Sequence, residues 1–336
     1  MIPENITSKI GRNLHNQENH PLSIVKNRIY RLFSDFPKFD TLNPVVSIRD
    51  NFDVLLIPPE HPSRRTSDTY YWGADQVLRT QTSAHQVDLL AKGNTQFLVT
   101  GDVYRKDDAD ATHFPVFHQM EGVKLCANPQ EDLHATLRLI INELFPDAQY
   151  KLVDSYFPFT HPSWEVEVFW EERWLEILGC GVIAEGVLQN AGIQNRTGWA
   201  FGLGLERLAM ILYKIPDIRL FWTQDTRFLS QFQEGTSTQF TPYSKLPACY
   251  KDIAFWLENE SEFSANEMVN LLRSIAGDLV EEVKLLDRFQ HPKTGKVSHC
   301  YRVNYRSWDR TLTNEEINAL HDRFREQLAT WKLVLR

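Results

Sequence analysis

The sequence predicts an α+β protein with two domains. Three strand-like runs, 151–159, 164–171 and 174–179, follow one another without a helix between them. Successive strands of this kind form an antiparallel sheet with the helices grouped elsewhere. A doubly wound parallel sheet would need a helix of about 10–15 residues between strands. The chain has 336 residues, which is enough for about two hydrophobic cores.

Helices and a hairpin complete the first domain. Pro21 suits the first position of a helix whose apolar residues form one stripe. Asn128 is the expected cap of a second helix, in which apolar residues recur at helical spacing from Leu133 to Leu144. The predicted helices are 21–34, 129–144 and 204–213, and two strands, 95–105 and 115–126, flank a polar loop at 106–113.

A small polar segment, 234–239 (EGTSTQ), predicts the boundary between the domains. We expect a first domain over 1–233, a linker over 234–241 and a second domain over 242–336. The second domain reads strand, helix, strand, strand, helix, strand, which is the order of a ferredoxin-like split βαβ fold. Its predicted spans are 248–256, 265–276, 280–289, 297–305, 314–330 and 331–335.

The charge is distributed unevenly along the chain. A net charge of −8 argues against a general nucleic-acid binder. Residues 240–336 are neutral, with 14 Lys and Arg against 14 Asp and Glu. Within them, 289–310 is a local basic stretch that contains Lys293, Lys296, Arg302, Arg306 and Arg310 against Asp309. On charge alone this stretch is either a solvated hairpin or a surface for RNA.

The sequence predicts neither a membrane span nor a disulfide framework. No stretch approaches the roughly 20 apolar residues of a membrane-spanning helix. The first 14 residues lack the patterns of a secretory signal and of a transit peptide, so any organellar targeting segment is expected to be missing here. Cys126, Cys180, Cys249 and Cys300 are far apart and lack paired metal-ligand spacing, so we expect free thiols in a reducing compartment.

One strand carries residues that suit a ligand pocket. Phe117, Gln119 and Glu121 are two residues apart, so their side chains share a face. A core strand does not place an amide and a carboxylate there, and a solvated face leaves Phe117 unexplained. An aromatic ring, an amide and a carboxylate together suit a flat ring and a cationic group, and Arg105 could reach the same pocket from the preceding strand.

A glycine-containing run precedes the last helix of the first domain. Gly202 and Gly204 let the backbone approach a ligand, and Arg207 follows on the helix. Two such glycines alone are weak evidence, because a tight helix-packing turn has the same pattern. Together with Arg105 and the strand above, they strengthen the prediction of a binding site.

These residues resemble two motifs of class II aminoacyl-tRNA synthetases. Arg105, His113, Phe117 and Glu121 resemble motif 2, and GLGLERL resembles motif 3. The segments TSAHQ (82–86), GDVYR (101–105), FHQMEG (117–122), FPFTHPS (157–163), LEILGCG (175–181) and WAFGLGLERLAM (199–210) resemble the phenylalanyl-tRNA synthetase family in its single-chain mitochondrial and plastid form. Residues 243–336 resemble that family's ferredoxin-fold anticodon-binding domain. The resemblance implies a class II antiparallel sheet flanked by helices.

The resemblance also implies a reaction and its residues. Phenylalanine and ATP would form phenylalanyl-adenylate, and the phenylalanyl group would move to the terminal ribose of tRNA(Phe), with Mg²⁺ as cofactor. The implied catalytic residues are Arg105, Arg207 and Glu176, and Glu176 is also the implied metal ligand. The implied ATP-binding residues are Arg105, Thr112, His113, Phe114, Phe117 and Arg207. The implied phenylalanine-binding residues are Gln81, Ser83, Ala84, His85, Gln86, Gln119, Met120, Glu121, Phe157, Phe159, Glu176 and Phe201. The implied tRNA-binding residues are Lys293, Lys296, Arg302 and Arg306.

One position departs from the family pattern, and two alternatives stay open. Gln81 stands where these enzymes usually have His, and Gln loses the positive charge while keeping hydrogen-bonding capacity. An adenylate-forming paralogue would pass phenylalanine to an acceptor other than tRNA, and a non-catalytic RNA-binding protein would typically have lost Arg105 or Arg207. The resemblance further implies a monomer without a second subunit. Its compartment would be the mitochondrial matrix or a plastid, or the cytoplasm if the source is bacterial.

Overall fold

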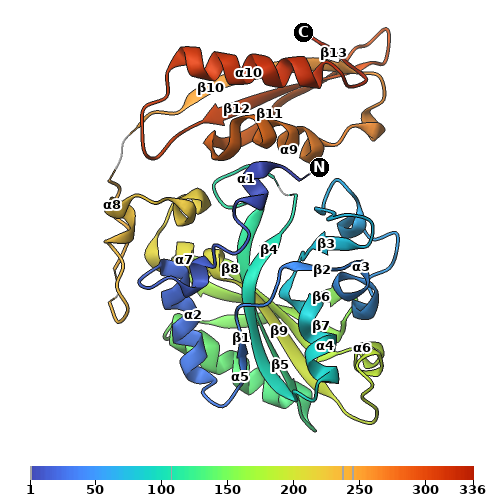
Figure 1. The fold of residues 1–336 in the computed structure, drawn as a ribbon, viewed down its shortest axis with the longest axis vertical. Coiled ribbons are helices and arrows are strands. Elements are labelled where there is room, and N and C mark those ends of the chain that lie inside the picture. Colours follow the sequence, from blue (N-terminus) through green and yellow to red (C-terminus); the bar gives the residue numbers. More distant parts are fainter. Residues whose placement is uncertain (1, 107, 237, 244–245) are drawn as a thin grey trace.

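The computed structural model describes residues 2–106, 108–236, 238–243 and 246–336. A seven-stranded sheet forms the centre of the first domain and a four-stranded sheet that of the second (Figure 1). A two-stranded sheet pairs β2 (Val45–Ser47) with β3 (Gln76–Leu78). The large sheet has the spatial order β1 (Lys38–Phe39), β4 (Gln96–Tyr104), β5 (Val116–Leu125), β9 (Gly198–Gly204), β8 (Arg173–Ile183), β7 (Thr160–Trp170) and β6 (Tyr150–Phe157).

The predicted antiparallel sheet is confirmed. Among the described strands of this sheet, only the short β1–β4 pair is parallel. Strand β5 lies between β4 and β9, so that Glu121 is opposite Val99 on one side and Gly202 on the other. The predicted motif 2 and motif 3 segments are therefore direct neighbours in the sheet.

Helices flank the sheet, and they belong to two hydrophobic cores. The larger core includes α2 (Pro21–Leu32), α5 (Pro129–Leu144) and α7 (Leu205–Tyr213). Of these, α2 and α7 lie to the left of the central strands in Figure 1. The smaller core includes α4 (Gln86–Ala91) and α6 (Glu185–Asn190), beside α3 (Ile48–Asn51). Short helices α1 (Glu4–Thr7) and α8 (Thr226–Leu229) lie toward the second domain (Figure 1).

The start of α5 follows from its sequence, with one correction. Pro129 occupies the first turn, and Glu131 and Asp132 follow it, where their charges interact favourably with the helix dipole. Asn128 has the capping position, but its side chain forms no capping hydrogen bond within the described chain. Asn128 therefore has the predicted position but does not form the predicted capping hydrogen bond. The helix begins at the predicted residue.

The second domain has the predicted ferredoxin-like topology. Its sheet has the order β11–β12–β10–β13, with the last and first strands of the unit adjacent. Ser264 accepts a hydrogen bond from the Glu267 amide and caps the first helix. Its elements are β10 (Cys249–Leu257), α9 (Ala265–Ala276), β11 (Val280–Gln290), β12 (Val297–Tyr305), α10 (Asn314–Leu328) and β13 (Leu333–Leu335).

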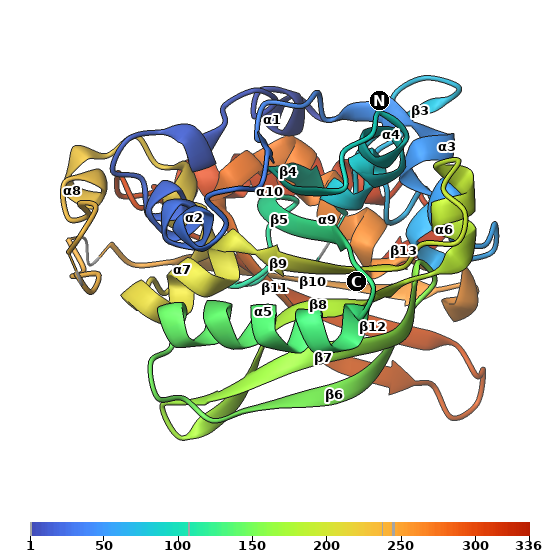
Figure 2. The ribbon, with the colours of Figure 1, turned by 90° about the horizontal axis from the view of Figure 1, so that it is seen from below.

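The two domains are stacked end to end. Viewed from below in Figure 2, the second domain lies behind the first. Helix α9 packs against α1 and faces the β4–β5 loop end of the first domain (Figure 1). The boundary at 234–241 stays a prediction, and Ser237 lies outside the described residues. No helix within the described ranges has both the length and the apolar character needed to cross a membrane.

Several predicted elements need correction, and one of the largest differences is at β7, which begins at Thr160 instead of at 164. The helix predicted over 21–34 ends at Leu32. Strand β8 continues to Ile183, beyond the predicted end at 179. The residues Gly198–Gly204 form strand β9, whereas the two glycines had indicated only a turn before a helix.

Candidate functional site

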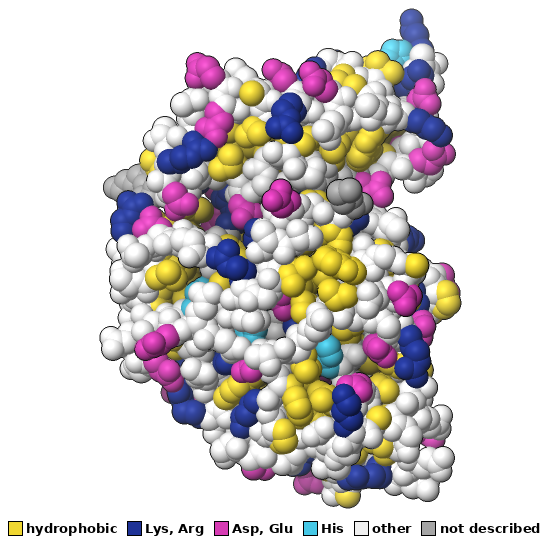
Figure 3. Space-filling view, viewed as in Figure 1, with side chains coloured by type: hydrophobic (Ala, Val, Ile, Leu, Met, Phe, Trp, Pro, Cys, Tyr) yellow, Lys and Arg dark blue, Asp and Glu magenta, His cyan; other side chains and the backbone are white. Residues whose placement is uncertain are grey.

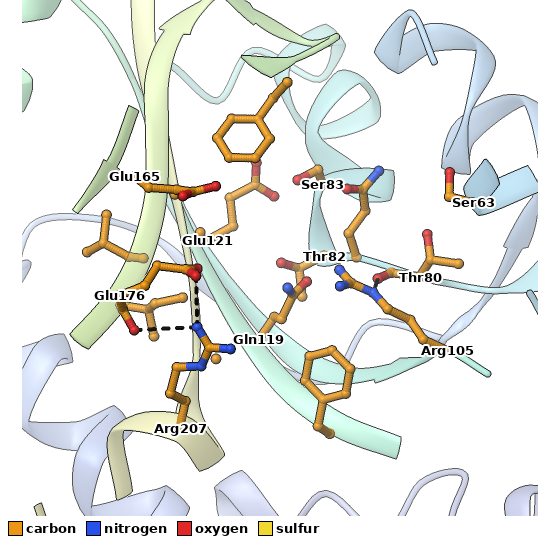
Figure 4. A pocket seen from close by; sticks show the side chains of 18 of the residues that line it. Ser63, Thr80, Thr82, Ser83, Arg105, Gln119, Glu121, Glu165, Glu176 and Arg207 are labelled. Carbon is orange, nitrogen blue, oxygen red and sulfur yellow. Dashed lines mark hydrogen bonds and ion pairs between the residues drawn. The ribbon is translucent and has the colours of Figure 1, made fainter. Parts of the chain in front are cut away.

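A cavity of about 670 Å³ opens on the sheet face that carries Phe117, Gln119 and Glu121. Its floor comes from β5, β8 and β9, and its walls from the β4–β5 loop, the β6–β7 turn and the 3₁₀ helix at Thr82–His85. This confirms the prediction that Phe117, Gln119 and Glu121 lie on the same face of β5. In Figure 4, Glu165, Glu176 and Arg207 line one side of the cavity and Arg105, Thr80 and Ser63 the other.

The cavity brings all the predicted ATP-binding side chains together. Arg105 donates a hydrogen bond from Nε to the Thr80 carbonyl at 2.8 Å, and its guanidinium lies 5.3 Å from the centroid of the Phe117 ring. Arg207 Nη1 forms an ion pair with Glu176 Oε2 at 3.2 Å and donates a hydrogen bond to the Glu176 carbonyl at 3.4 Å (Figure 4). Thr112, His113 and Phe114 line the same cavity from the β4–β5 loop. This part of the cavity presents two guanidinium groups and an aromatic ring.

Asp110 organises the β4–β5 loop, although sequence reasoning missed it. Its carboxylate accepts hydrogen bonds from the His113 amide at 2.8 Å and the Thr112 amide at 2.6 Å, and Oδ2 lies 2.7 Å from His113 Nδ1. Partial burial favours a higher pKa for Asp110, but the hydrogen bonds from His113 and Thr112 outweigh it and lower that pKa below its ordinary value. The run Asp-Ala-Thr-His, in a polar loop, was the available signal for this turn.

Glu121 lies at the closed end of the cavity. Only 2% of it is exposed, and Oε2 has no hydrogen-bond partner among the described residues. Burial raises the pKa of Glu121 to about 8, against a hydrogen bond with Ser83 that lowers it. A buried carboxyl with an open acceptor position suits a cationic group, because an ammonium would supply both the charge and the missing hydrogen bonds.

Two phenylalanine rings form the apolar wall next to this carboxyl. The Phe157 and Phe159 rings stack at 5.9 Å with an interplanar angle of 15°. The two were expected to alternate along one strand, but β6 ends at Phe157 and Phe159 lies in the following turn. Gly179 makes room for Phe157, since a Cβ at position 179 would lie 2.8 Å from the ring. An added methyl group there would push the ring into the cavity.

Four of the predicted phenylalanine-binding residues do not line the cavity, and this corrects the expectation. Met120 faces the core on the other side of β5, because neighbouring strand residues alternate. Ala84 packs in the smaller core. His85 lies 2.8 Å from Arg79 Nη1, and burial, together with Arg79, lowers its pKa to about 3. Gln86 is buried, and neither of its side-chain polar atoms has a partner within the described chain. The other eight line the cavity, namely Gln81, Ser83, Gln119, Glu121, Phe157, Phe159, Glu176 and Phe201.

Among the cavity residues that were not predicted, two add polar groups to the site. Glu165 on β7 lines the cavity near Glu176 and accepts a hydrogen bond from Ser155 at 2.9 Å (Figure 4). The alternating run Trp-Glu-Val-Glu-Val was its signal. Asn266 comes from the second domain and still lines the cavity, which no local sequence pattern could indicate. Among the residues described, no three His, Cys, Asp or Glu side chains form a ready metal cluster, so Glu165 and Glu176 offer hard oxygen ligands only in combination with a ligand's own oxygens.

The predicted tRNA-binding residues are divided between two places. Lys293 and Lys296 are exposed in the β11–β12 turn. Arg302, on β12, pairs with Asp252 at 2.8 Å and lies over the Tyr250 ring. Arg306 instead lies at the interface between domains, where it pairs with Glu281 and its carbonyl accepts a hydrogen bond from Arg219. The structure therefore does not place Arg306 with the other three.

Aromatic side chains share the uncovered face of the second sheet with Arg302. Trp256 and Phe289 both lie opposite Ser298 on β12, with ring centroids 6.0 Å apart. The Arg336 guanidinium lies 5.5 Å from the Trp256 ring centroid, and Tyr250 is 63% exposed. The opposite face is covered by α9 and α10. On the molecular face drawn in Figure 3, acidic and basic side chains are interspersed rather than segregated.

Comparisons with known proteins agree with this architecture. Residues 3–232 match the family model for the class II core domain (F) of tRNA synthetases, and residues 244–336 match that for the ferredoxin-fold anticodon binding domain. The chain is 49% identical to the chloroplastic/mitochondrial phenylalanine--tRNA ligase of Arabidopsis thaliana, over 97% of this chain and 80% of the relative. It is 45% identical to the mitochondrial phenylalanine--tRNA ligase of Mus musculus, over 97% and 83%.

A third relative matches a smaller part of this chain. The phenylalanine--tRNA ligase alpha subunit of Erwinia tasmaniensis is 41% identical over 66% of this chain and 70% of the relative. Two relatives thus cover almost the whole chain at well above 30% identity, and both domain models match. The chain is an aminoacyl-tRNA synthetase of class II and belongs to the phenylalanine--tRNA ligase family.

Proposed function

We propose that this chain activates L-phenylalanine with ATP and transfers the phenylalanyl group to the terminal ribose of tRNA(Phe). The observation that carries the proposal is that one cavity combines Arg105, Phe117 and Arg207 with the buried Glu121 and an apolar wall of two phenylalanine rings. Such a cavity suits ATP at one end and an amino acid with a flat apolar side chain at the other. The relatives give no support to a paralogue with an acceptor other than tRNA.

In the first step, the phenylalanine carboxylate attacks the α-phosphorus of ATP, and pyrophosphate leaves. Two negative groups must approach each other, so the barrier has a large electrostatic part. Arg105 would hold the carboxylate and an α-phosphate oxygen through paired N–H donors. Phe117 and Arg207 would hold the adenine between a ring and a guanidinium plane. Because Arg105 lies over Phe117 and Arg207 pairs with Glu176, ATP would replace these two contacts.

Glu176 and Glu165 would hold Mg²⁺ together with the phosphate oxygens. Their carboxylates are the hard oxygen ligands that this ion prefers, and both line the cavity. The ion would neutralise charge on the phosphates as the bond to pyrophosphate breaks. Release of Glu176 from its pair with Arg207 would make both residues available at the same time.

Phenylalanine would place its ring between the β6–β7 turn and β8, next to Phe157 and Phe159. Its ammonium group would bind Glu121, Gln119 and Ser83, which surround the closed end. Gln81 and Phe201 would contact the remaining atoms of the amino acid. The edge-to-face and offset contacts that aromatic rings prefer would then distinguish phenylalanine from aliphatic amino acids.

For tRNA, we propose that the uncovered face of the second sheet receives the anticodon. Lys293 and Lys296 would contact phosphates. The exposed Tyr250 and Phe289, with the partly buried Trp256, would stack on unpaired bases. This assignment leaves Arg306 out, because it belongs to the domain interface. We further propose that the chain acts as a monomer without a second subunit, in the mitochondrial matrix or a plastid.

The test is phenylalanine-dependent ATP–pyrophosphate exchange on the purified chain, run beside charging of tRNA(Phe). The proposal predicts both activities, and Arg207→Ala should reduce both. Arg288→Ala provides a matched control, because Arg288 pairs with Glu260 on the second domain, away from the cavity. Exchange without charging would favour the paralogue. Absence of exchange with every aromatic amino acid would contradict the proposed activity.

A further inference from the structure

The second domain holds the loop that lines the ATP end of the cavity. Ala109, in the β4–β5 loop, is 2% exposed and belongs to the hydrophobic core of the second domain. The Val283 amide, on β11, donates a hydrogen bond to the Ala109 carbonyl at 2.8 Å. Arg273, on α9, donates from Nη2 to the Asp108 carbonyl at 2.7 Å. The same loop continues directly to Thr112, His113 and Phe114.

One face of α9 contacts the first domain along the length of the helix. Asn266, Asn270 and Arg273 are four and three residues apart, so they lie on the same side of the helix. Asn266 lines the cavity, and its Nδ2 lies 3.5 Å from the Lys106 carbonyl. Asn270 accepts a hydrogen bond from the Tyr70 hydroxyl at 2.8 Å. Arg273 is 5% exposed, and a guanidinium this deeply buried needs the acceptors that surround it.

A second contact reaches the same loop from the N-terminal segment. Lys9 Nζ lies 2.8 Å from Asp278 Oδ2 of the second domain. The same ammonium lies 5.4 Å from the ring centroids of both Phe114 and Trp222. Asp278 therefore fixes a lysine that packs directly on Phe114, a side chain at the ATP end of the cavity. Two separate parts of the second domain, α9 and Asp278, thus act on residues 108–114.

We infer that Arg273 is a positioning residue for ATP: by binding the Asp108 carbonyl, it keeps the β4–β5 loop in the conformation that presents His113 and Phe114 to the nucleotide. The inference rests on the proposed adenylation reaction. A polar loop without these anchors would populate many conformations, and ATP binding would then have to order it. The docked second domain therefore favours activation of the amino acid, and movement of this domain away would weaken ATP binding.

The test is the KM for ATP in pyrophosphate exchange, measured beside the KM for phenylalanine. For Arg273→Ala we expect the KM for ATP to rise by about fivefold or more, while the KM for phenylalanine stays the same. Arg273→Lys keeps one donor and should restore part of the loss. Arg288→Ala removes the same charge from an exposed ion pair on the same domain and should leave both constants unchanged.

A second variant and a direct readout cover the case in which Arg273→Ala does not fold. Asp278→Asn, at a half-exposed carboxylate, should also raise the KM for ATP, by a smaller factor. Hydrogen–deuterium exchange of the peptide over 105–115 should become faster in both variants, while the strands of the large sheet stay protected.

Three results would count against the inference or against its basis. An unchanged KM for ATP in a folded Arg273→Ala variant would overturn it. A faster rate of ATP–pyrophosphate exchange in that variant would also overturn it, because the docked domain would then be inhibitory. Absence of ATP–pyrophosphate exchange in the wild-type chain would instead contradict the proposed reaction. The failure of the inference and the failure of the proposed reaction are therefore distinguishable.

Discussion

Glu121 combines deep burial with an open acceptor position. At neutral pH its carboxyl is mostly protonated, because burial raises its pKa to about 8. An ammonium group binds the ionised form, so binding must remove this proton. The charge of the residue therefore depends on whether the site is filled, and phenylalanine binding is coupled to pH.

We predict that phenylalanine affinity rises with pH up to about pH 8. Below the pKa, each pH unit increases the ionised fraction of Glu121 roughly tenfold, so the Kd should fall by a similar factor between pH 6 and pH 7. Isothermal titration calorimetry in buffers of different ionisation enthalpy checks both the Kd and the released proton. Glu121→Gln should abolish the proton release. A Kd that increases with pH would indicate that the neutral acid is the binding form.

Gln81 carries a separate prediction. It lines the cavity, and its Nε2 lies 3.4 Å from the Asn51 carbonyl. We predict that Gln81→His raises kcat/KM for phenylalanine by about tenfold or more, the value of one hydrogen bond to a charged group. Steady-state adenylation kinetics provide the measurement. Gln96→His, at the start of β4 and away from the cavity, is the matched control; no change or a decrease at position 81 would contradict the hypothesis.

At the residue scale, most of the predicted ATP- and phenylalanine-binding residues line the cavity, but many of the other lining residues were not predicted. Phe117, Gln119 and Glu121 could be predicted because strand alternation alone places them on one face. Gln86 and Met120 were expected to bind as well, because they lie within the motifs, but a motif does not say which of its side chains lies outside the ligand site. Asp110 and Glu165 were missed because their roles depend on a turn and on strand pairing.

At the element scale, a buried acid joins the two motifs. Glu206 on α7 accepts hydrogen bonds from the His118 amide and lies 2.7 Å from His118 Nδ1. Both side chains are almost fully buried, and Arg207 is the next residue on the helix. The His118 ring also packs on Trp222 at 5.8 Å. The pair therefore fixes the helix that carries Arg207 against the strand that carries Phe117.

We predict that Glu206→Ala destabilises the protein by about 2–5 kcal/mol, because it leaves buried donors unpaired. Urea unfolding followed by fluorescence measures this loss. Glu206→Gln keeps an acceptor for the His118 amide and should lose less. Glu316→Ala, which removes a carboxylate from an exposed ion pair with Arg310, is the control and should have little effect. Equal losses for Glu206→Ala and the control would show that the buried pair is unimportant.

The elements themselves were largely predictable, and the exceptions have a physical cause. Helix α9 and strand β12 have the predicted bounds, because each has one continuous apolar face. Strand β9 was missed because glycines weaken a strand and usually indicate a turn. Here the glycines face the ligand side of a central strand, where Gly202 pairs with Glu121 and Gly179. Hydrogen bonds from both neighbouring strands maintain the strand in spite of its glycines.

At the scale of the whole molecule, the predicted anticodon face should make tRNA binding sensitive to salt. Each lysine that neutralises a phosphate releases counterions, so log K falls linearly with log salt. We predict that Lys293→Ala weakens tRNA(Phe) binding and reduces this slope by about one. Filter binding at several KCl concentrations measures both quantities. Arg306→Ala should leave the slope unchanged, because Arg306 lies at the interface, and a change there would contradict the assignment.

The arrangement of the domains was beyond sequence reasoning. The two folds could be predicted from the separate patterns of strands and helices. Their interface depends on isolated contacts such as those of Arg273 with the Asp108 carbonyl and Lys9 with Asp278, which leave no periodic signal in either segment. For the same reason Arg306, inside a basic stretch, could not be separated from the residues on the uncovered face.

Asn266 belongs to the second domain and lines the cavity, so a ligand in the cavity can contact both domains. A small molecule that fills the ATP end and also hydrogen bonds to this amide would touch both domains at once. It would stabilise the docked arrangement of the two domains, since its binding free energy would include the free energy of keeping them together. An inhibitor of this kind would trap the enzyme in the arrangement in which the two domains are docked.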